Sequence, residues 1–344
     1  MLKSNKQQNN KKKKTKKPMS NKKKIIAIVS SIILLYLAIW GGTGAYRIYS
    51  LYDEMYDSAE EDEIMDVIHT EEIGEEAPEP EDEETLSRVQ KIRRDMDAIY
   101  DQGRSEKDPN LLNVLLIGVD GPRADTIMLA QYNKETGKAA MLSIPRDTYV
   151  KIPERGYDKI NHAHAFGGVN RQRASVENFL DIHIDHYARI DMQSFSRVID
   201  VLGGVEVHVS SDIIDNRDGS VFKSQGTHNL NGSQALDYVR FRSDNRGDFG
   251  RIDRQQQVMM AIMDELTKAS NVTRYLQLME EISPYVRTDI TPGVVTSNWR
   301  AFNSLSSSNV QRETLSGDNL MINGIYYLEV DMEQAREKAK NLTY

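Results

Sequence analysis

No cysteine occurs among the 344 residues. A small protein held together by disulfide bonds is therefore excluded, and the lack of thiols is compatible with export from a cell that does not rely on disulfides. The mean hydropathy is -0.57, and no second long apolar stretch follows the one near the N-terminus. This excludes a polytopic membrane protein. A Leu-Pro-x-Thr-Gly sorting signal is also absent, so the N-terminal stretch is the one anchor that the sequence predicts.

Two segments each contain charges of one sign only, although the overall net charge of -8 does not show this. Residues 1–24 contain eleven lysines and no acidic residue, whereas residues 53–84 contain seventeen acidic residues and no lysine or arginine. The remaining C-terminal region is close to neutral. Three physically different segments therefore share one chain, and the acidic one is expected to be an extended, solvated spacer.

Residues 25–46 carry no charge and are long enough, at about 33 Å as a helix, to cross the hydrocarbon core of a bilayer. Trp40 lies where an aromatic residue would anchor the outer end. A cleaved signal peptide ending at Ala45 is the alternative, but the apolar run and the basic region are both long for one. The lysines before this stretch predict a cytoplasmic N-terminus and an extracellular C-terminal region, in a single-pass protein of the cell membrane.

The predicted organisation has four parts, which are a basic cytoplasmic tail (1–24), a transmembrane signal-anchor helix (25–46), an acidic extracytoplasmic linker (47–85) and an extracytoplasmic domain (86–344). Apolar residues recur at helical spacing from Leu86 to Ile99. Strand patterns follow at 111–117, 127–132, 139–144, 185–190 and 205–209, and helical patterns at 174–180 and 192–202. This alternation predicts an α/β domain with a central mixed sheet flanked by helices, an α-β-α sandwich. Residues 324–330 form another strand pattern, which could join the main sheet.

The first polar cluster follows the apolar strand pattern directly and spans residues 120–126. Asp120 and Asp125 supply hard oxygen ligands that suit Mg²⁺, which commonly takes one or two protein carboxylates together with substrate phosphate oxygens. For this segment taken alone, a capped turn with a surface ion pair is the simpler interpretation.

Two further clusters contain arginines. Arg146 follows Pro145 at the end of the 139–144 strand, because proline cannot continue the ladder. Arg240 and Arg242 are two residues apart and would point the same way on an extended backbone. Arg251 and Gln255 are four apart at the start of a predicted helix. Guanidinium groups bind phosphate oxygens bidentately and stay charged, so the set indicates a diphosphate site, although each arginine alone could be a surface charge.

Other ligands fit the pattern less well. His162 and His164 are two residues apart, but no further histidine or cysteine of suitable spacing lies near them, which argues against zinc. Nucleic acid is an unattractive partner for a slightly acidic, external domain.

The chain resembles the LytR-CpsA-Psr (LCP) family of cell-envelope proteins. The resemblance is carried, in collinear order within the core region 111–266, by segments 115–120, 123–126, 143–148 (Ser-Ile-Pro-Arg-Asp-Thr), 159–163, 201–205, 230–236 and 238–255. The family implies a membrane-anchored phosphotransferase that moves a glycopolymer, of teichoic acid or capsule type, from a polyprenyl-pyrophosphate carrier to peptidoglycan in a phosphodiester linkage.

The resemblance also implies roles for individual residues. Asp120 and Asp125 would coordinate Mg²⁺. The pyrophosphate would be held by Arg123, Arg146, Arg240, Arg242, Arg251 and Gln255, and the catalytic set would be Arg146, Arg240, Arg242, Arg251, Asp120 and Asp125. Asp248 falls at an acidic position of the family pattern and would orient an arginine or a metal-bound water. Asp147, judged from the residues and not from the resemblance, is a candidate general base or else an ion-pair partner of an arginine. The family usually has a longer loop before the second aspartate, so the metal geometry could differ here.

Two other functions use the same arginines. One is a non-catalytic membrane protein that senses or tethers wall polymers or has a regulatory role, and the short segment from Asp120 to Asp125 is the reason to consider it. The other is a polyprenyl-pyrophosphate hydrolase. Sequence alone leaves these alternatives open.

Overall fold

The structure is a computed structural model of the whole chain, and it describes residues 46, 50, 77–101, 105–268, 280–298 and 305–344. The predicted tail and nearly all of the predicted signal-anchor helix and linker up to residue 76 lie outside the described residues. Among the residues that are described, no helix is both long and apolar enough to cross a membrane.

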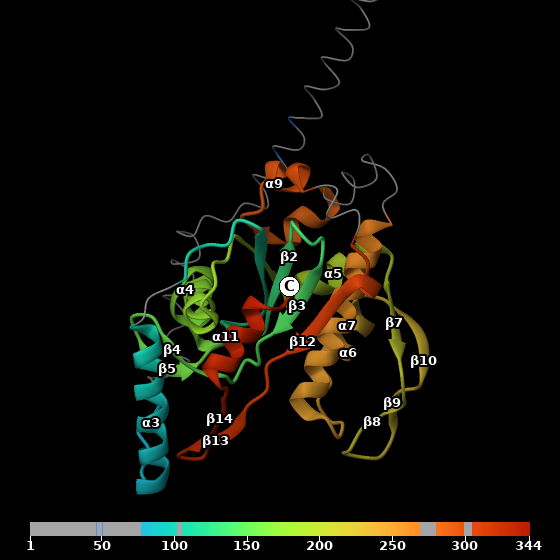
Figure 1. The fold of residues 1–344 in the computed structure, drawn as a ribbon. Coiled ribbons are helices and arrows are strands. Elements are labelled where there is room, and N and C mark those ends of the chain that lie inside the picture. The colour runs from blue at the N-terminus through green and yellow to red at the C-terminus, as the bar shows by residue number, and fades with distance from the viewer. Residues whose placement is uncertain (1–45, 47–49, 51–76, 102–104, 269–279, 299–304) are drawn as a thin grey trace, which may run out of the picture. The chain divides into compact units, whose positions relative to one another are not determined.

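A mixed sheet of six strands forms the centre of the domain, in the order β11-β6-β1-β2-β3-β12 (Figure 1). Its strands are β1 (Leu111–Asp120), β2 (Arg123–Asn133), β3 (Ala139–Ser143), β6 (His186–Asp191), β11 (Arg287–Thr288) and β12 (Val310–Thr314). β1 pairs antiparallel with β2 and parallel with β6, while β3 pairs antiparallel with β2 and parallel with β12. The predicted mixed sheet is therefore confirmed.

Helices cover both faces of this sheet (Figure 1). The described helices of the domain are α3 (Glu83–Tyr100), α4 (His162–Leu180), α5 (Met192–Leu202), α6 (Gly232–Arg240), α7 (Gly247–Thr267), α9 (Pro292–Ser297) and α11 (Met332–Lys340). The main hydrophobic core joins one face of β1 to β3 with residues of α3, α4 and α11. On the other face a smaller methionine cluster, consisting of Met128, Met141 and Met260 with Met259 and Met263 packed against it, joins the sheet to α7.

Short strand pairs and two 3₁₀ helices complete the described part of the domain. Their bounds are β4 (Tyr149–Ile152), β5 (Gly156–Lys159), β7 (Val205–Val209), β8 (Ile213–Ile214), β9 (Val221–Lys223), β10 (Gly226–Leu230), β13 (Asp318–Ile322), β14 (Ile325–Glu329), η2 (Ser283–Tyr285) and η3 (Ser307–Asn309). A third apolar cluster lies between β7, β10, α5, α6 and α7. The expectation that residues 324–330 could join the main sheet is wrong, because β14 pairs with β13 and the sheet edge is taken by β12.

Residues 77–85, which the sequence assigned to the linker, are part of the folded domain. Ala77 is buried, and its N–H group donates to the carbonyl of Tyr157 at 3.1 Å. Glu79 forms an ion pair with Arg93, and Asp82 caps α3 by accepting from the N–H group of Thr85. An N-cap aspartate satisfies helix donors that would otherwise lack partners. The described end of the acidic segment is therefore ordered against the domain.

Candidate phosphate-binding site

The site begins at the turn between β1 and β2. Asp120 ends β1 opposite Arg123, so Gly121 and Pro122 alone connect the strands. Gly121 has a φ of +61°, a backbone conformation that glycine adopts readily at the first position of a two-residue hairpin. The segment that is short relative to the family pattern is thus a complete hairpin turn.

A β-bulge places Asp125 beside this turn. Gly118 pairs with Thr126 and the next residue, Val119, pairs with Ala124, so Asp125 is the extra residue on its strand. A bulge bends the strand and changes the direction of the side chain, and bulges are frequent next to active sites. This feature gives the second aspartate an orientation that regular strand alternation would not.

Arg146 reaches Asp125 from the end of β3. Its Nη1 donates to Oδ1 of Asp125 at 2.5 Å, and its Nε lies 3.6 Å from Oδ2 of Asp147, too far for a hydrogen bond. Burial opposes the charge of Arg146, but Asp125, together with Asp147 and Asp248, raises its pKa. Nε of Arg146 is buried without a hydrogen-bond partner among the described residues.

Arg240 approaches from the end of α6, and Arg242 from the segment between α6 and α7. Nη2 of Arg240 donates to Oδ2 of Asp120 at 2.9 Å, and Nη2 of Arg242 lies 3.9 Å from Oδ2 of Asp125. The extended backbone expected for this pair is wrong, because Arg240 is the last residue of α6, which starts from a capping box at Asn231 and has Phe241 as its C-cap. The two arginines nevertheless reach the adjacent aspartates.

Arg251 is the least exposed charged group of the site, with 2% of its side chain accessible. It forms an ion pair with Asp248 at 2.7 Å, while its Nε and Nη1 are buried and have no hydrogen-bond partner among the described residues. Burial foremost, and then the like charges of Arg242 and Arg146, lower its pKa to about 10 despite Asp248. The guanidinium remains charged at neutral pH, and its charge is incompletely compensated.

Two of the expected residues are less closely joined to the others. Arg123 is exposed at the β1–β2 turn, and the structure records no ion pair between it and a described residue. Gln255 is buried on α7, one turn after Arg251, and no hydrogen bond of its side chain is recorded within the described part of the chain. The structure therefore brings Asp125, Arg146, Arg242, Arg251 and Asp248 together and places Asp120 with Arg240 at the rim.

Asp147 and Asp248, the candidate base and orienting residues, are both paired with cations. Asp147 accepts from Nζ of Lys159 at 2.8 Å, and Asp248 pairs with Arg251. In this arrangement both carboxylates position basic side chains.

Sequence reasoning missed three residues that hold the site in place. Lys159 binds Asp147, and Arg254, 4% exposed, donates to Asp244 and to the carbonyl of Phe241, which fixes the segment that carries Arg242. Gln256 donates to Ser143 at 2.8 Å and to the carbonyl of Glu313 at 2.9 Å, which ties α7 to the sheet. Lys159 and Arg254 lie inside family segments and Gln256 directly follows one, but only the fold shows what each contacts.

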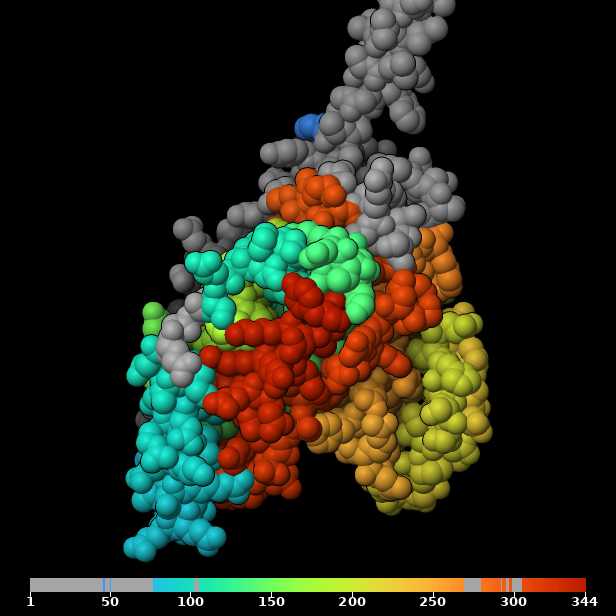
Figure 2. Space-filling view, in the orientation of Figure 1, coloured from blue at the N-terminus to red at the C-terminus, as the bar shows by residue number. Residues whose placement is uncertain are grey.

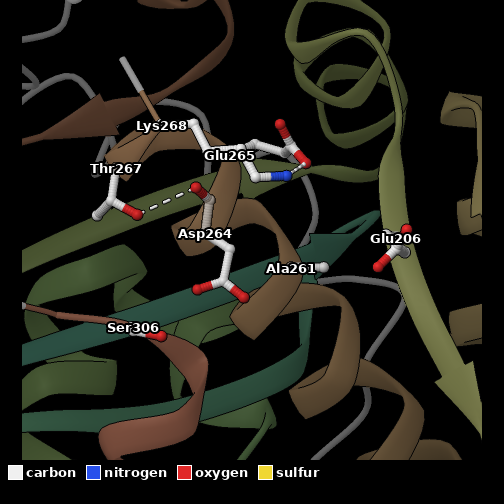
Figure 3. Close-up of a pocket in the computed structure, with 7 residues that line it drawn as sticks. All are labelled: Glu206, Ala261, Asp264, Glu265, Thr267, Lys268 and Ser306. Carbon is white, nitrogen blue, oxygen red and sulfur yellow. Dashed lines mark hydrogen bonds and ion pairs between the residues drawn. The ribbon is translucent and has the colours of Figure 1, made fainter. Parts of the chain in front are cut away.

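A separate pocket of about 380 Å³ lies near the C-terminal end of α7 and is lined by Glu206, Ala261, Asp264, Glu265, Thr267, Lys268 and Ser306 (Figure 3). Three of its seven lining residues are acidic, and none is a site arginine. Lys268 is paired with Glu265, as the close-up shows. The pocket is therefore unsuited to binding a diphosphate.

Known proteins are similar to this chain over most of its domain. The model of the LytR_cpsA_psr family matches residues 76–343. The chain belongs to this family. It is 38% identical over 247 residues to the polyisoprenyl-teichoic acid–peptidoglycan teichoic acid transferase TagU of Bacillus subtilis, covering 69% of this chain and 78% of that protein. The transferase TagT of the same organism is 34% identical over 254 residues, with coverages of 69% and 78%.

Solved LCP structures share the fold. The crystal structure of B. subtilis TagV matches with a TM-score of 0.60 and 31% identity, over 68% of this chain and 97% of that one. A structure described as TagT bound to LI-WTA matches with a TM-score of 0.59 and 33% identity, over 69% and 92% of the two chains. At these identities, the likeness extends beyond the fold to the family.

Proposed function

We propose that this LCP protein transfers a teichoic acid from a polyisoprenyl-diphosphate carrier to peptidoglycan, as its relatives TagU and TagT are named for doing. The observation that carries the proposal is the buried, incompletely compensated guanidinium of Arg251, next to Arg146 and Arg242. Buried donors without partners are costly, and a diphosphate would supply both the charge and the acceptors that they lack.

The reaction requires little covalent chemistry from the protein. The acceptor hydroxyl oxygen forms a bond to the phosphorus that carries the glycan. The bond from that phosphorus to the polyisoprenyl phosphate breaks, its electron pair leaves with that phosphate, and the hydroxyl proton passes to water. Arginines that are already fixed by carboxylates stabilise the charge that develops on the phosphoryl oxygens. Arg146 and Arg251 are held in this way by Asp125 and Asp248.

Magnesium is a further part of the proposal. Among the described residues, no group of three or more potential metal ligands is found. Two carboxylates are sufficient for Mg²⁺ when phosphate oxygens and water complete the shell, so the donor chemistry of Asp120 and Asp125 fits. Bound there, the ion would neutralise phosphate charge. Both aspartates would have to exchange arginine contacts for the metal, since they pair with Arg240 and Arg146.

The polyisoprenyl chain requires an apolar surface. We place it along the partly buried side chains of the methionine cluster between the sheet and α7, where Leu116, Met259, Met263 and Val310 surround three buried methionines. Methionine is flexible and fits irregular apolar ligands. We also infer, from the charge pattern of the sequence, that residues 25–46 anchor the protein in the cell membrane with the domain outside.

The test is transfer of a lipid-diphosphate-linked glycan to peptidoglycan oligomers by the full-length protein, with Mg²⁺ or with a chelator. Wild-type protein is expected to form the phosphodiester, and Arg146→Ala and Asp125→Ala to lower the rate at least ~100-fold, as for lost electrostatic stabilisation. Arg94→Ala, which removes an exposed arginine paired with Asp95, is the matched control.

If the two site substitutions leave the activity unchanged, the assignment of the site is wrong. Release of phosphate-bearing glycan without an acceptor would instead indicate a hydrolase, and tight binding without turnover would indicate a sensor. Activity that persists in the chelator would remove magnesium from the mechanism.

A further inference from the structure

The hairpin of β13 and β14 has one mainly buried face and one face that is exposed except at Leu328, which is 2% exposed and belongs to the main core. Leu320, Ile322 and Tyr327 point into the main core. The cross-strand register places Asn319, Met321 and Tyr326 together on the opposite face. There Met321 is 50% and Tyr326 37% exposed, and the hydroxyl of Tyr326 donates to Oδ1 of Asn319 at 3.2 Å. These three residues are called the hairpin platform below.

The hairpin platform is fixed directly beside the arginine site. Leu328 of β14 forms a bridge with Thr148, and its N–H group donates to the carbonyl of Asp147 at 2.9 Å. Burial, and then the negative charges of Asp147 and Asp248, raise the pKa of Tyr326, so its phenol lies within electrostatic reach of both carboxylates. In the space-filling view the surface is indented between the C-terminal red segment and the segment of α6 and α7 (Figure 2).

Helix α7 shows on which side of the arginines the hairpin platform lies. Asp248, which acts on Tyr326, and Phe249, 41% exposed, are in its first turn. Arg251 follows, and Met259 and Met263 of the methionine cluster are eight and twelve residues farther, or roughly 12 and 18 Å along the axis. Arg251 thus separates the hairpin platform from the surface assigned to the polyisoprenyl chain.

We propose that the hairpin platform binds the acceptor, with the ring of Tyr326 packed against a sugar of the peptidoglycan glycan strand and Asn319 hydrogen-bonded to it. This rests on the proposed transferase function, in which the acceptor must approach the phosphorus opposite the departing polyisoprenyl phosphate. Pyranose rings present apolar C–H faces to aromatic side chains, and their hydroxyl and acetamido groups match an amide.

The composition of the hairpin favours a glycan over a lipid surface. Residues 318–329 contain Asp318 and Glu329 but no lysine or arginine. Binding to anionic headgroups depends on basic residues, so a membrane is a poor occupant.

The experiment measures transfer by full-length protein in detergent at varied acceptor and at varied donor concentrations. Tyr326→Ala is expected to raise the acceptor KM about 10-fold, since losing an aromatic contact of about 1–1.5 kcal/mol has this effect. The donor KM and kcat should stay within twofold, and Tyr326→Trp and Tyr326→Phe should restore most of the acceptor affinity. Ile325→Ala, next in sequence, 42% exposed and on the opposite face, is the matched control and should behave as wild type.

An unchanged acceptor KM in Tyr326→Ala overturns the proposal, as does an equal rise in the donor KM, which would assign the hairpin platform to the donor glycan. Loss of binding to anionic vesicles with normal acceptor KM would assign it to the membrane. A second measurement separates the subsite from catalysis, namely direct binding of a tetrasaccharide of N-acetylglucosamine and N-acetylmuramic acid. If wild type binds it in a Tyr326-dependent way yet transfers nothing, the subsite stands and the transferase proposal fails. If transfer occurs but binding of the tetrasaccharide does not depend on Tyr326, the transferase proposal stands and the subsite proposal fails.

Discussion

Replacing Arg251 with methionine is expected to make the protein more stable and nearly inactive. The side chain is 2% exposed, and its pKa falls from 12.5 to about 10, with burial as the main cause and neighbouring arginines adding to it. At 1.36 kcal/mol per pKa unit, the charged form is disfavoured by about 3 kcal/mol in the folded state. The guanidinium is protonated in both the folded and the unfolded protein below pH 10, so this penalty is fully present at neutral pH.

Methionine has similar length and no charge, so Arg251→Met removes the penalty and leaves Asp248 partly solvated at 36% exposure. Replacing buried ionic groups by apolar ones is often stabilising by 1–4 kcal/mol. We expect the free energy of unfolding to rise by about 1–3 kcal/mol in chemical denaturation without ligand. Transfer activity is expected to fall at least ~100-fold. Inorganic pyrophosphate should raise the melting temperature of wild type but not of the variant.

Arg254 is the matched control, three residues along the same helix and 4% exposed. Its guanidinium binds Asp244 and the carbonyl of Phe241 and lies 5.4 Å from the centre of the Phe241 ring. Arg254→Met should therefore destabilise by about 3–5 kcal/mol, the usual result of breaking a buried pair. A loss of more than about 1 kcal/mol in Arg251→Met, or equal effects of the two substitutions, would refute the reasoning.

Three further predictions concern the surroundings of the site and the domain. Asp147 and Lys159 lie 2.8 Å apart and are expected to act as one pair. Asp147→Asn and Lys159→Met should each slow transfer, and the double variant should be no slower than the slower single variant. Additive losses would instead assign Asp147 an independent role as base. Gly121→Ala should destabilise by about 1 kcal/mol in denaturant titrations, because φ is +61° and no atom crowds the new methyl group, whereas wild-type stability would exclude a strained turn. Burial alone would raise the pKa of Asp181, but Lys340 and Ser105 lower it. The ionised carboxylate therefore stabilises the folded state above the unfolded pKa near 4, and this contribution is lost as the pH falls through the folded pKa. Lys340→Met should thus lower the free energy of unfolding by about 1 kcal/mol at pH 7 and by much less at pH 2, and a pH-independent difference would contradict this.

Periodicity in the sequence was sufficient to find the elements near the site. The apolar run from Leu111 predicted β1, and the strands expected at 127–132 and 139–144 and the helix at 192–202 are confirmed. These signals are local, because a buried strand and an amphipathic helix each leave a pattern within a few residues. Arg240 is the exception. Its neighbourhood was interpreted as extended, but the capping box at Asn231 and Gln234 starts a helix that includes it.

The sequence by itself determined the membrane topology that we propose, the mixed α/β class and the set of arginines and aspartates, since charge blocks, hydrophobic period and ordered motifs are one-dimensional properties. Only the tertiary structure decided which of these charges meet. The bulge at Asp125, the burial of Arg251 without enough partners, and the placement of Tyr326 beside Asp147 join segments up to 179 residues apart. Only the packing of the folded chain brings such distant segments together, because the chemical properties of a residue do not specify which distant residue it will contact.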